Sequence, residues 1–121
     1  MNAIRITLKG VPPSLNRFAG RMNTNEYRHE KKIWTDAVGW SVKAIKDRPP
    51  TFQKANVYIL YYFPTAGRHD PDNYAGKFLL DGLTQAGVIA DDRFGCIKLH
   101  LDGAVDRDNP RTVITVTEET G

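Results

Sequence analysis

The chain of 121 residues has a single cysteine, Cys96, and this scarcity excludes several classes of protein. One thiol cannot close an internal disulfide, and structural zinc sites usually need four Cys or His ligands. The surrounding FGCIKLHL alternates in the manner of a strand interior, which gives no support to a catalytic thiol. We therefore expect Cys96 to pack in the core or on a strand rather than to react.

Long apolar runs are also missing. The longest nearly apolar stretch, VYILYYF at 57–63, is far shorter than the roughly 20 residues of a membrane-spanning helix. The N-terminus MNAIRITLKG lacks the basic start, apolar core and small-residue cleavage site of a secretory signal. We therefore expect a cytoplasmic protein with no membrane partner. The length and the 40% hydrophobic content fit one domain over 1–121.

Acidic residues are few in the first part of the chain. Residues 1–54 hold eleven Lys and Arg against four Asp and Glu, a net charge of +7, whereas residues 55–121 hold six against ten, a net charge of −4. This asymmetry indicates a polyanionic partner together with a locally acidic site. A simpler alternative stays open, in which the basic residues only form the solvated face of a helix. Those residues are Lys31, Lys32, Lys43 and Lys46.

The spacing of apolar residues predicts four strands and two helices. Four segments have the composition or the two-residue alternation of strands: 3–9, 56–63, 95–103 and 111–118. Two segments carry apolar residues every three or four positions, as helices do: 27–47 and 74–86. The order β-α-β-α-β-β predicts a single small α+β domain, with a mixed sheet of about four strands and two helices packed on it.

Two details of this arrangement can be predicted further. The apolar positions of the first helix include Ile33, Ala37, Trp40 and Ala44, with Trp34, Val38 and Ile45 alongside. The turn-rich AVDRDNP between the last two strands favours an antiparallel hairpin.

Acidic residues gather in one short stretch of this basic chain. RHDPDNY at 68–74 and ADDRF at 90–94 flank the second predicted helix, and with Asp81 they hold five of the fourteen acidic residues. If that helix packs against the sheet, the chain after it can return toward its start and bring both ends together. Carboxylates within about 4 to 6 Å raise one another's pKa unless a cation neutralises them. The stretch therefore predicts a bound divalent cation.

A purely structural role for the same acids stays open. Asp70 followed by Pro71 is typical of a helix start, because the carboxylate can cap a backbone N–H and proline suits the first helical position. Asp72 in the first turn would be favoured by the helix dipole. Asp91 and Asp92 can belong simply to a polar turn before the next strand.

Four carboxylates are the candidate metal ligands: Asp70, Asp72, Asp91 and Asp92. Oxygen donors from Asp, with water in the remaining positions, suit Mg²⁺ or Mn²⁺ rather than zinc. Asp70 and Asp72 are two residues apart and can share one ion from a turn, which Asp91 or Asp92 would close. Beside a phosphodiester, such an ion polarises a phosphoryl oxygen and lowers the pKa of a bound water.

Further polar residues near the acids are candidates for accessory roles. His69 can be an outer-shell partner of the ion or a proton carrier, or it can be an ordinary loop histidine. Lys77 lies four residues after Asn73 and four before Asp81, so a continuous helix would align these groups on one face. There Lys77 can neutralise a phosphate or a transition-state charge, or form a surface pair worth a few tenths of a kcal/mol.

The run DPDNYAGKFLLDGLTQAGVIADD, together with VPPSLNRF near the N-terminus, resembles the RusA family of Holliday junction resolvases. These are small phage- and prophage-associated endonucleases. The family pattern has a PPS-x-N element after the first strand, then D-x-D-N, a lysine and L-D-x-L on a helix, and a closing D-D. The resemblance covers essentially the whole chain in length and in element order.

The resemblance implies roles for individual positions. Asp70, Asp72 and Asp92 match the three metal-binding acids, and Asp91 is the neighbouring alternative to Asp92. Lys77 matches the helix lysine that assists catalysis, although it lies one residue further from D-x-D-N than in the family pattern. On a helix, that shift rotates the side chain by about 100°.

The resemblance also implies partners. Family members are similar in being homodimers that hold four-way DNA junctions and nick two opposed strands with Mg²⁺ or Mn²⁺. A twofold homodimer suits a substrate of near-twofold symmetry. DNA contacts, mainly to phosphates, are expected from a set of polar and basic residues. They are Asn16, Arg17, Arg21, Arg28, Lys31, Lys32, Arg68 and Asn73.

The sequence thus leads us to expect a metal-dependent, structure-selective DNA endonuclease. It would resolve Holliday junctions by phosphodiester hydrolysis, in DNA recombination and repair. Two alternatives remain. One is a non-catalytic module that binds branched DNA, and the other is a metal-dependent nuclease for flaps, duplex DNA or RNA.

Overall fold

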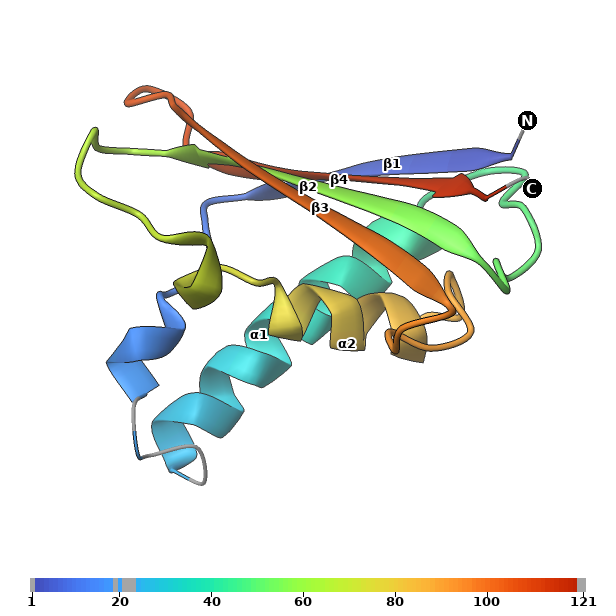
Figure 1. Ribbon diagram of the computed structural model, residues 1–121, viewed down its shortest axis with the longest axis horizontal. Helices are drawn as coiled ribbons and strands as arrows, with labels where there is room; N and C mark the ends of the chain where they lie inside the picture. Colours follow the sequence, from blue (N-terminus) through green and yellow to red (C-terminus); the bar gives the residue numbers. More distant parts are fainter. Residues whose placement is uncertain (1, 19, 21–23, 120–121) are drawn as a thin grey trace.

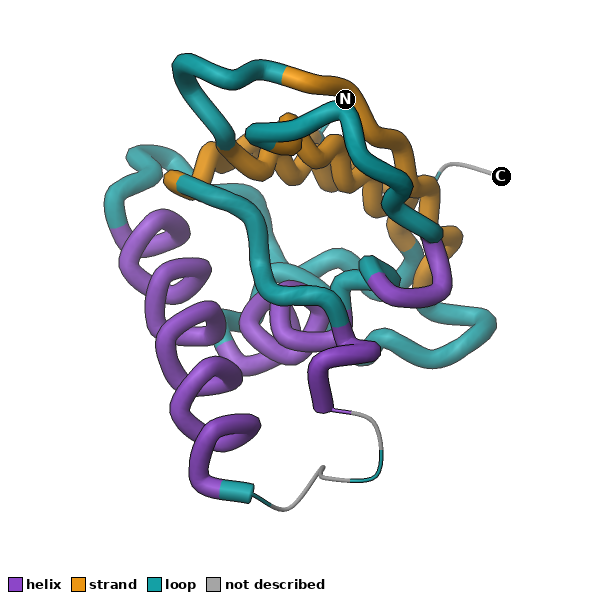
Figure 2. The backbone as a smooth tube through the Cα atoms, turned by 90° about the vertical axis from the view of Figure 1, so that its left-hand side faces the viewer, coloured by secondary structure: helices purple, strands orange, loops and turns teal. Residues whose placement is uncertain are grey.

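Two helices cover one face of a four-stranded sheet in the computed structural model, which describes residues 2–18, 20 and 24–119 (Figure 1). The elements in chain order are β1 (Ala3–Lys9), the 3₁₀ helix η1 (Leu15–Phe18), α1 (Asn25–Lys43), β2 (Ala55–Phe63), the 3₁₀ helix η2 (Pro71–Asn73), α2 (Lys77–Gln85), β3 (Ile97–Val105) and β4 (Arg111–Glu118). This order confirms the expected α+β class, with four strands and two α-helices. Figure 2 shows both α-helices on the same side of the sheet.

The sheet order is β1-β4-β2-β3, with β4 antiparallel to both of its neighbours and β3 parallel to β2. The predicted hairpin between the last two strands is therefore wrong. Burial explains the order, because half of the β4 positions are buried and only the last is exposed, so that β4 takes an interior place. In contrast, β3 carries Lys98, His100 and Asp102 and lies at the edge. Charged side chains are common on edge strands because they discourage unwanted pairing.

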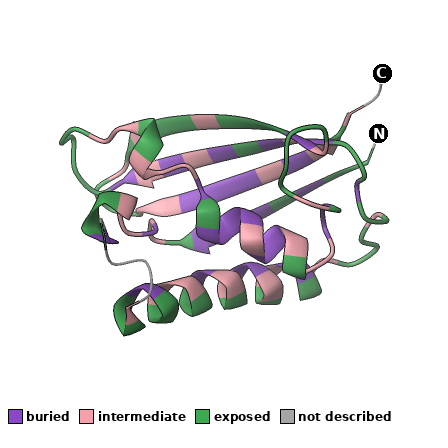
Figure 3. Ribbon diagram, turned by 60° about the horizontal axis from the view of Figure 1, so that its bottom comes forward, coloured by how far each residue is buried: buried purple, intermediate pink, exposed green. Residues whose placement is uncertain are grey.

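The core lies between the helices and the inward face of the sheet. Alternate residues of β1 and β2 are buried, because successive side chains of a strand point to opposite faces. Figure 3 shows the buried positions where the two layers meet. The helices contribute a set of apolar side chains that includes Trp34, Val38, Val42, Phe78, Leu79 and Leu83. Within the described ranges, no helix is both long enough and apolar enough to cross a membrane.

The buried face of α1 differs from the expected one. Trp34, Val38 and Val42, spaced four residues apart, face the core, whereas Ile33 is exposed and the side chain of Trp40 is 71% exposed. Of the apolar positions named from the spacing, Ile33 and Trp40 therefore do not face the core. The closest approach of α2 selects this face, because Gly82 of α2 packs directly on Val38.

The second predicted helix is divided in two by a glycine. Residues 71–73 form η2, and α2 begins only at Lys77, after Gly76 in the left-handed conformation with φ of 81°. A Cβ atom on Gly76 would lie 2.6 Å from Cδ1 of Ile59, so both the backbone angle and the available space require glycine. This break places η2 beyond the end of β2 and separates it from α2.

Two glycine substitutions in the helices should have opposite effects on stability. Gly82→Ala places a Cβ atom 2.8 Å from Cβ of Val38, and overpacking of this kind costs about 1 to 3 kcal/mol. Gly39→Ala on α1 meets no atom within 4 Å, so only the higher helix propensity of alanine acts, which adds up to about 1 kcal/mol. We expect urea unfolding to show a lower free energy of unfolding for Gly82→Ala and a higher one for Gly39→Ala. Shifts in the same direction would contradict the close contact between α1 and α2.

Candidate metal and nucleic-acid site

Asp70 and Asp72 lie at η2, just beyond the end of β2. Pro71 occupies the first position of η2, but the Asp70 side chain makes no capping hydrogen bond. One Asp70 carboxylate oxygen instead accepts from Nε of Arg68 at 3.0 Å. Asp72 lies inside the turn and is exposed. Both carboxylates are therefore accessible from solvent, and helix capping does not account for Asp70.

Asp91 and Asp92 lie in the turn between α2 and β3. One Asp91 carboxylate oxygen accepts from the backbone N–H of Asp92 at 2.8 Å, and the other accepts from Nη1 of Arg93 at 3.2 Å. These bonds fix the Asp91 carboxylate within the turn. Asp92 is the more exposed member of the pair.

The expected meeting of the two acidic pairs does not occur within one chain. Because β2 and β3 are parallel, α2 carries the chain from the end of β2 back toward its beginning, where Ile89 bridges Phe52. Figure 1 shows η2 and the turn before β3 at opposite ends of α2. That helix alone spans roughly 13 Å, at about 1.5 Å per residue. As a result, the described residues contain no group of three His, Cys, Asp or Glu side chains placed to hold a metal ion.

The N-terminal segment packs against the joint between η2 and α2. Pro12, Pro13 and Leu15 line one narrow crevice together with Asn73 and Lys77. The PPS-x-N element and the D-x-D-N element, more than fifty residues apart in sequence, are therefore neighbours in space. Asn16 and Arg17 follow directly in η1, and both are exposed.

Lys77 is the first residue of α2 and is exposed. Since Asn73 belongs to η2, the expected alignment of Asn73 and Lys77 on one helix face is wrong. Asp81 pairs with Lys31 of α1, with 3.4 Å between Oδ2 and Nζ, and so links the two helices.

The expected DNA-contacting residues gather mainly on η1 and on the first half of α1. Most of their cations form ion pairs at the surface: Arg17 with Glu26 at 2.6 Å, Lys31 with Asp81, Lys32 with Asp36 at 2.9 Å, and Arg68 with Asp70. Arg28 donates to Oδ1 of Asn25 at 3.2 Å, and Arg21 lies outside the described residues. Exposed pairs of this kind contribute about 0 to 1 kcal/mol, so a phosphate can replace the carboxylate partner.

A cluster of three aromatic rings holds together η1 and the first half of α1, which we call the basic end of the molecule. Phe18 of η1, Tyr27 of α1 and Phe78 at the start of α2 meet edge to face, with ring centroids 5.3 to 6.4 Å apart. Rings in this arrangement attract one another beyond the effect of their burial. Each ring is adjacent in sequence to a cation, and these cations are Arg17, Arg28 and Lys77. The cluster therefore fixes where three separate elements present positive charge.

An aromatic pocket of about 150 Å³ lies beside the Asp70 turn, a feature that the sequence did not reveal. The ring of His69 stacks on Phe63, with centroids 3.8 Å apart and an angle of 8° between the planes, and Tyr74 meets both rings edge on. His69 therefore has a structural role, because its ring packs between Phe63 and Tyr74. The lining residues of the aromatic pocket are Tyr61, Phe63, His69, Asp70, Pro71, Tyr74, Leu101, Asp102 and Gly103.

Tyr61 contributes a buried hydroxyl to this region. Its side chain is 2% exposed, and its hydroxyl oxygen has no hydrogen-bond partner among the described residues. Burial, and then the nearby Tyr74, raise the pKa of the Tyr61 phenol well above its ordinary value. The phenol is therefore neutral across the physiological range.

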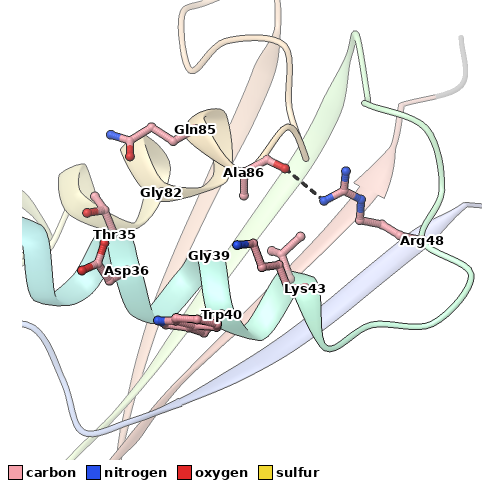
Figure 4. Close-up of a pocket in the computed structure, with 10 residues that line it drawn as sticks. Thr35, Asp36, Gly39, Trp40, Lys43, Arg48, Gly82, Gln85 and Ala86 are labelled. Atoms are coloured by element: carbon pink, nitrogen blue, oxygen red, sulfur yellow. Dashed lines mark hydrogen bonds between the residues drawn. The ribbon is translucent and has the colours of Figure 1, made fainter.

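A wider hollow of about 640 Å³ lies between α1 and α2, away from the acidic turns (Figure 4). Trp40 and Lys43 form part of its wall, with Nζ of Lys43 5.1 Å from the Trp40 ring centroid. At its end, Nη1 of Arg48 donates to the carbonyl oxygen of Ala86 at 3.0 Å. None of the residues expected from the sequence to bind metal or DNA lines this hollow.

The chain matches no protein-family model and no curated protein. The likeness to the RusA pattern therefore rests on the residues of the sequence alone.

The buried Tyr61 hydroxyl should be a measurable source of alkaline instability. Above pH of about 10, the ordinary tyrosine pKa, the unfolded state loses this proton while the folded state keeps it, so stability falls as pH rises. At neutral pH, Tyr61→Phe removes an unpaired buried group and should raise the free energy of unfolding by about 1 kcal/mol. Urea unfolding at neutral pH and above pH 10 should show a smaller alkaline loss for Tyr61→Phe. The exposed Tyr58→Phe serves as control, and equal behaviour of the two variants would contradict the assignment.

Proposed function

We propose that this protein is a metal-dependent endonuclease that cuts branched DNA, with the Holliday junction as its substrate. The observation that carries the proposal is the packing of the Pro12–Pro13 segment against Asn73 and Lys77. It brings the basic end formed by η1 and α1 beside the Asp70 turn. A nuclease needs both groups together, because cations hold the phosphates while the acids act at the scissile bond.

The donor chemistry supports Mg²⁺ or Mn²⁺ as the cofactor. Asp70 and Asp72 offer accessible carboxylate oxygens, the donors that these hard cations prefer. A divalent ion, when bound, supplies charge stabilisation and an activated water for phosphodiester hydrolysis. One chain, however, presents these two acids without the Asp91 and Asp92 pair, so the expected set of ligands does not fit a single chain.

The cations around the Asp70 turn support a phosphate-binding surface. Arg17, Arg28 and Lys77 are exposed around the aromatic cluster, and Arg68 lies at the turn itself. Their replaceable partners and their spread over several elements suit the recognition of a backbone rather than of bases. Asn16, Lys31, Lys32 and Asn73 extend the same surface, and we also assign Arg21 to it from the sequence.

A homodimer in the cytoplasm of a bacterial or phage-infected cell completes the proposal. Two copies related by a twofold axis would present two acidic turns to a junction of near-twofold symmetry. The lysine matched by the resemblance, Lys77, would neutralise charge on the phosphate.

A second candidate function is a module that binds branched DNA without cutting it. The separation of the two acidic pairs within one chain favours this alternative. A panel of four-way junctions, flaps, linear duplex and RNA, incubated with and without Mg²⁺, distinguishes it from a nuclease and also identifies the substrate class.

Loss of one acid should abolish cleavage and spare binding. We expect Asp72→Asn to reduce Mg²⁺-dependent nicking of a synthetic four-way junction by at least about 100-fold, because one charged oxygen ligand is lost. Junction affinity in the absence of metal should change little. Asp47→Asn is the matched control, since Asp47 is exposed and has a positive φ of 56° that asparagine also tolerates. Retained nicking by Asp72→Asn would remove this acid from the active site.

The salt dependence of junction binding should show directly whether the basic end contacts DNA phosphates. Each phosphate contact contributes roughly 0.9 to the slope of log affinity against log salt concentration. Replacing Arg17 and Arg28 by alanine should therefore make the slope shallower by about 2 units. A double variant of Lys43 and Lys46, further along the chain from the basic end, should leave the slope unchanged. Fluorescence anisotropy with a labelled junction measures both, and an unaltered slope for the first variant would exclude this surface.

A further inference from the structure

One face of the sheet is left uncovered. Both α-helices pack on the opposite face, and no helix of the described chain lies over this one (Figure 1). We call it the open face and define it by three rows of residues, each of which crosses β1, β4, β2 and β3 in that order. The rows are Arg5, Thr115, Tyr58 and His100; Thr7, Val113, Leu60 and Asp102; and Lys9, Arg111, Tyr62 and Ala104.

The open face carries more positive than negative charge. Three of its residues are Lys or Arg, and Asp102 is the one acid among them. Arg111 is already engaged, since its Nη1 lies 2.8 Å from Oδ2 of Asp106 and its Cζ lies 3.7 Å from the ring centroid of Tyr62. Within residues 2–18, 20 and 24–119, neither Arg5 nor Lys9 forms an ion pair. These two cations suit an anionic partner.

Two stacked rings stand on the open face. The ring of Tyr58, which is 43% exposed, stacks on His100 with centroids 4.4 Å apart and an angle of 13° between the planes. Nε2 of His100 is hydrogen-bonded to Oδ1 of Asn56 at 3.2 Å, which holds the second ring in place. His100 thus covers one face of the Tyr58 ring, and the other face is directed toward β4. A ring that is already ordered loses little conformational freedom when it binds a partner.

The short side chain of Thr115 leaves a gap between Arg5 and Tyr58. Their strands are two spacings apart, roughly 9.6 Å at about 4.8 Å per spacing. Stacked rings in this protein lie 3.8 and 4.4 Å apart, and a flat ring between the guanidinium and Tyr58 needs about twice such a distance. A hollow of about 350 Å³ lies over this gap, and Arg5, Tyr58, Val113 and Thr115 are among the residues that line it. The gap therefore fits one flat ring.

We propose that the open face binds a single-stranded nucleic acid, with one base held between Tyr58 and Arg5. Bases are flat, they stack on aromatic rings and guanidinium planes, and they are joined to phosphates. Only an unpaired base enters the gap freely, because a base in a duplex must first be unstacked. Arg5 and Lys9 are four residues apart on β1, about 13 Å, and positive charge over this length suits a strand rather than a free nucleotide. The site lies on the other side of the sheet from α1, and so it is separate from the basic end (Figure 2).

Fluorescence anisotropy without a divalent ion tests this site apart from any cleavage. A labelled oligo-dT should bind at least about 5-fold more tightly than an abasic oligonucleotide of the same length and charge, because only oligo-dT has rings that can stack. Equal affinities would overturn the proposal, because charge alone would then account for the binding. Failure of oligo-dT to bind would overturn it as well.

Substitutions at the two walls of the gap locate the base. Tyr58→Ala should weaken oligo-dT binding at least about 5-fold and remove the preference over the abasic strand, whereas Tyr58→Phe keeps the ring and should bind as the wild type does. Arg5→Lys should also weaken binding, since an ammonium group keeps the charge but cannot stack. Trp40→Ala is the matched control, because it removes an exposed aromatic residue from α1 and should change neither readout. Circular dichroism confirms that the variants are folded.

Two other results would assign the binding or the open face differently. If replacement of Arg17 and Arg28 by alanine abolishes oligo-dT binding while Tyr58→Ala leaves it intact, the strand lies on the basic end. If Tyr58→Ala lowers the mass of the protein measured by light scattering, the open face is an interface between copies of the chain. Either result would overturn the proposed strand site, and neither depends on the proposed nuclease function.

Discussion

The parallel pairing of β2 with β3 is the constraint on which the rest of the structure depends. A parallel pair cannot be joined by a tight turn, so α2 must carry the chain back across the sheet. The same crossover buries Phe78, Leu79 and Leu83 against the sheet and α1. It also places the Asp70 turn and the Asp91 turn at opposite ends of α2, and it leaves β3 at the edge.

The separation of the acidic turns allows one chain to fold without a bound cation. Each acidic turn has its own arginine, Arg68 beside Asp70 and Arg93 beside Asp91. Four carboxylates in one small volume would repel one another, whereas two separate pairs with local arginines do not.

Aromatic residues position the charged groups near the end of β2, where the chain enters η2 and then α2. The cluster of Phe18, Tyr27 and Phe78 fixes the cations of the basic end, and the rings around Phe63 fix the Asp70 turn. Gly76 lies between these two groups of rings, and only glycine fits there, because any side chain would meet Ile59. The charged residues are exposed and their ion pairs are weak, so packing of rings rather than charge holds the surface in place.

The sequence by itself determined the elements, their order and the basic and acidic halves of the chain, because alternation, helical spacing and charge are local properties. It also placed Asp70 and Asp72 in a turn, on either side of Pro71. It did not determine which strands are neighbours: the turn before β4 favoured a hairpin, but the apolar face of β4 is better buried between β1 and β2. Only the tertiary structure decided that Trp40 faces solvent, that Gly76 ends one helix before another begins, and that the acids lie apart. Each of these depends on contacts between residues distant in sequence, such as Gly82 with Val38 and Gly76 with Ile59, which no local pattern records.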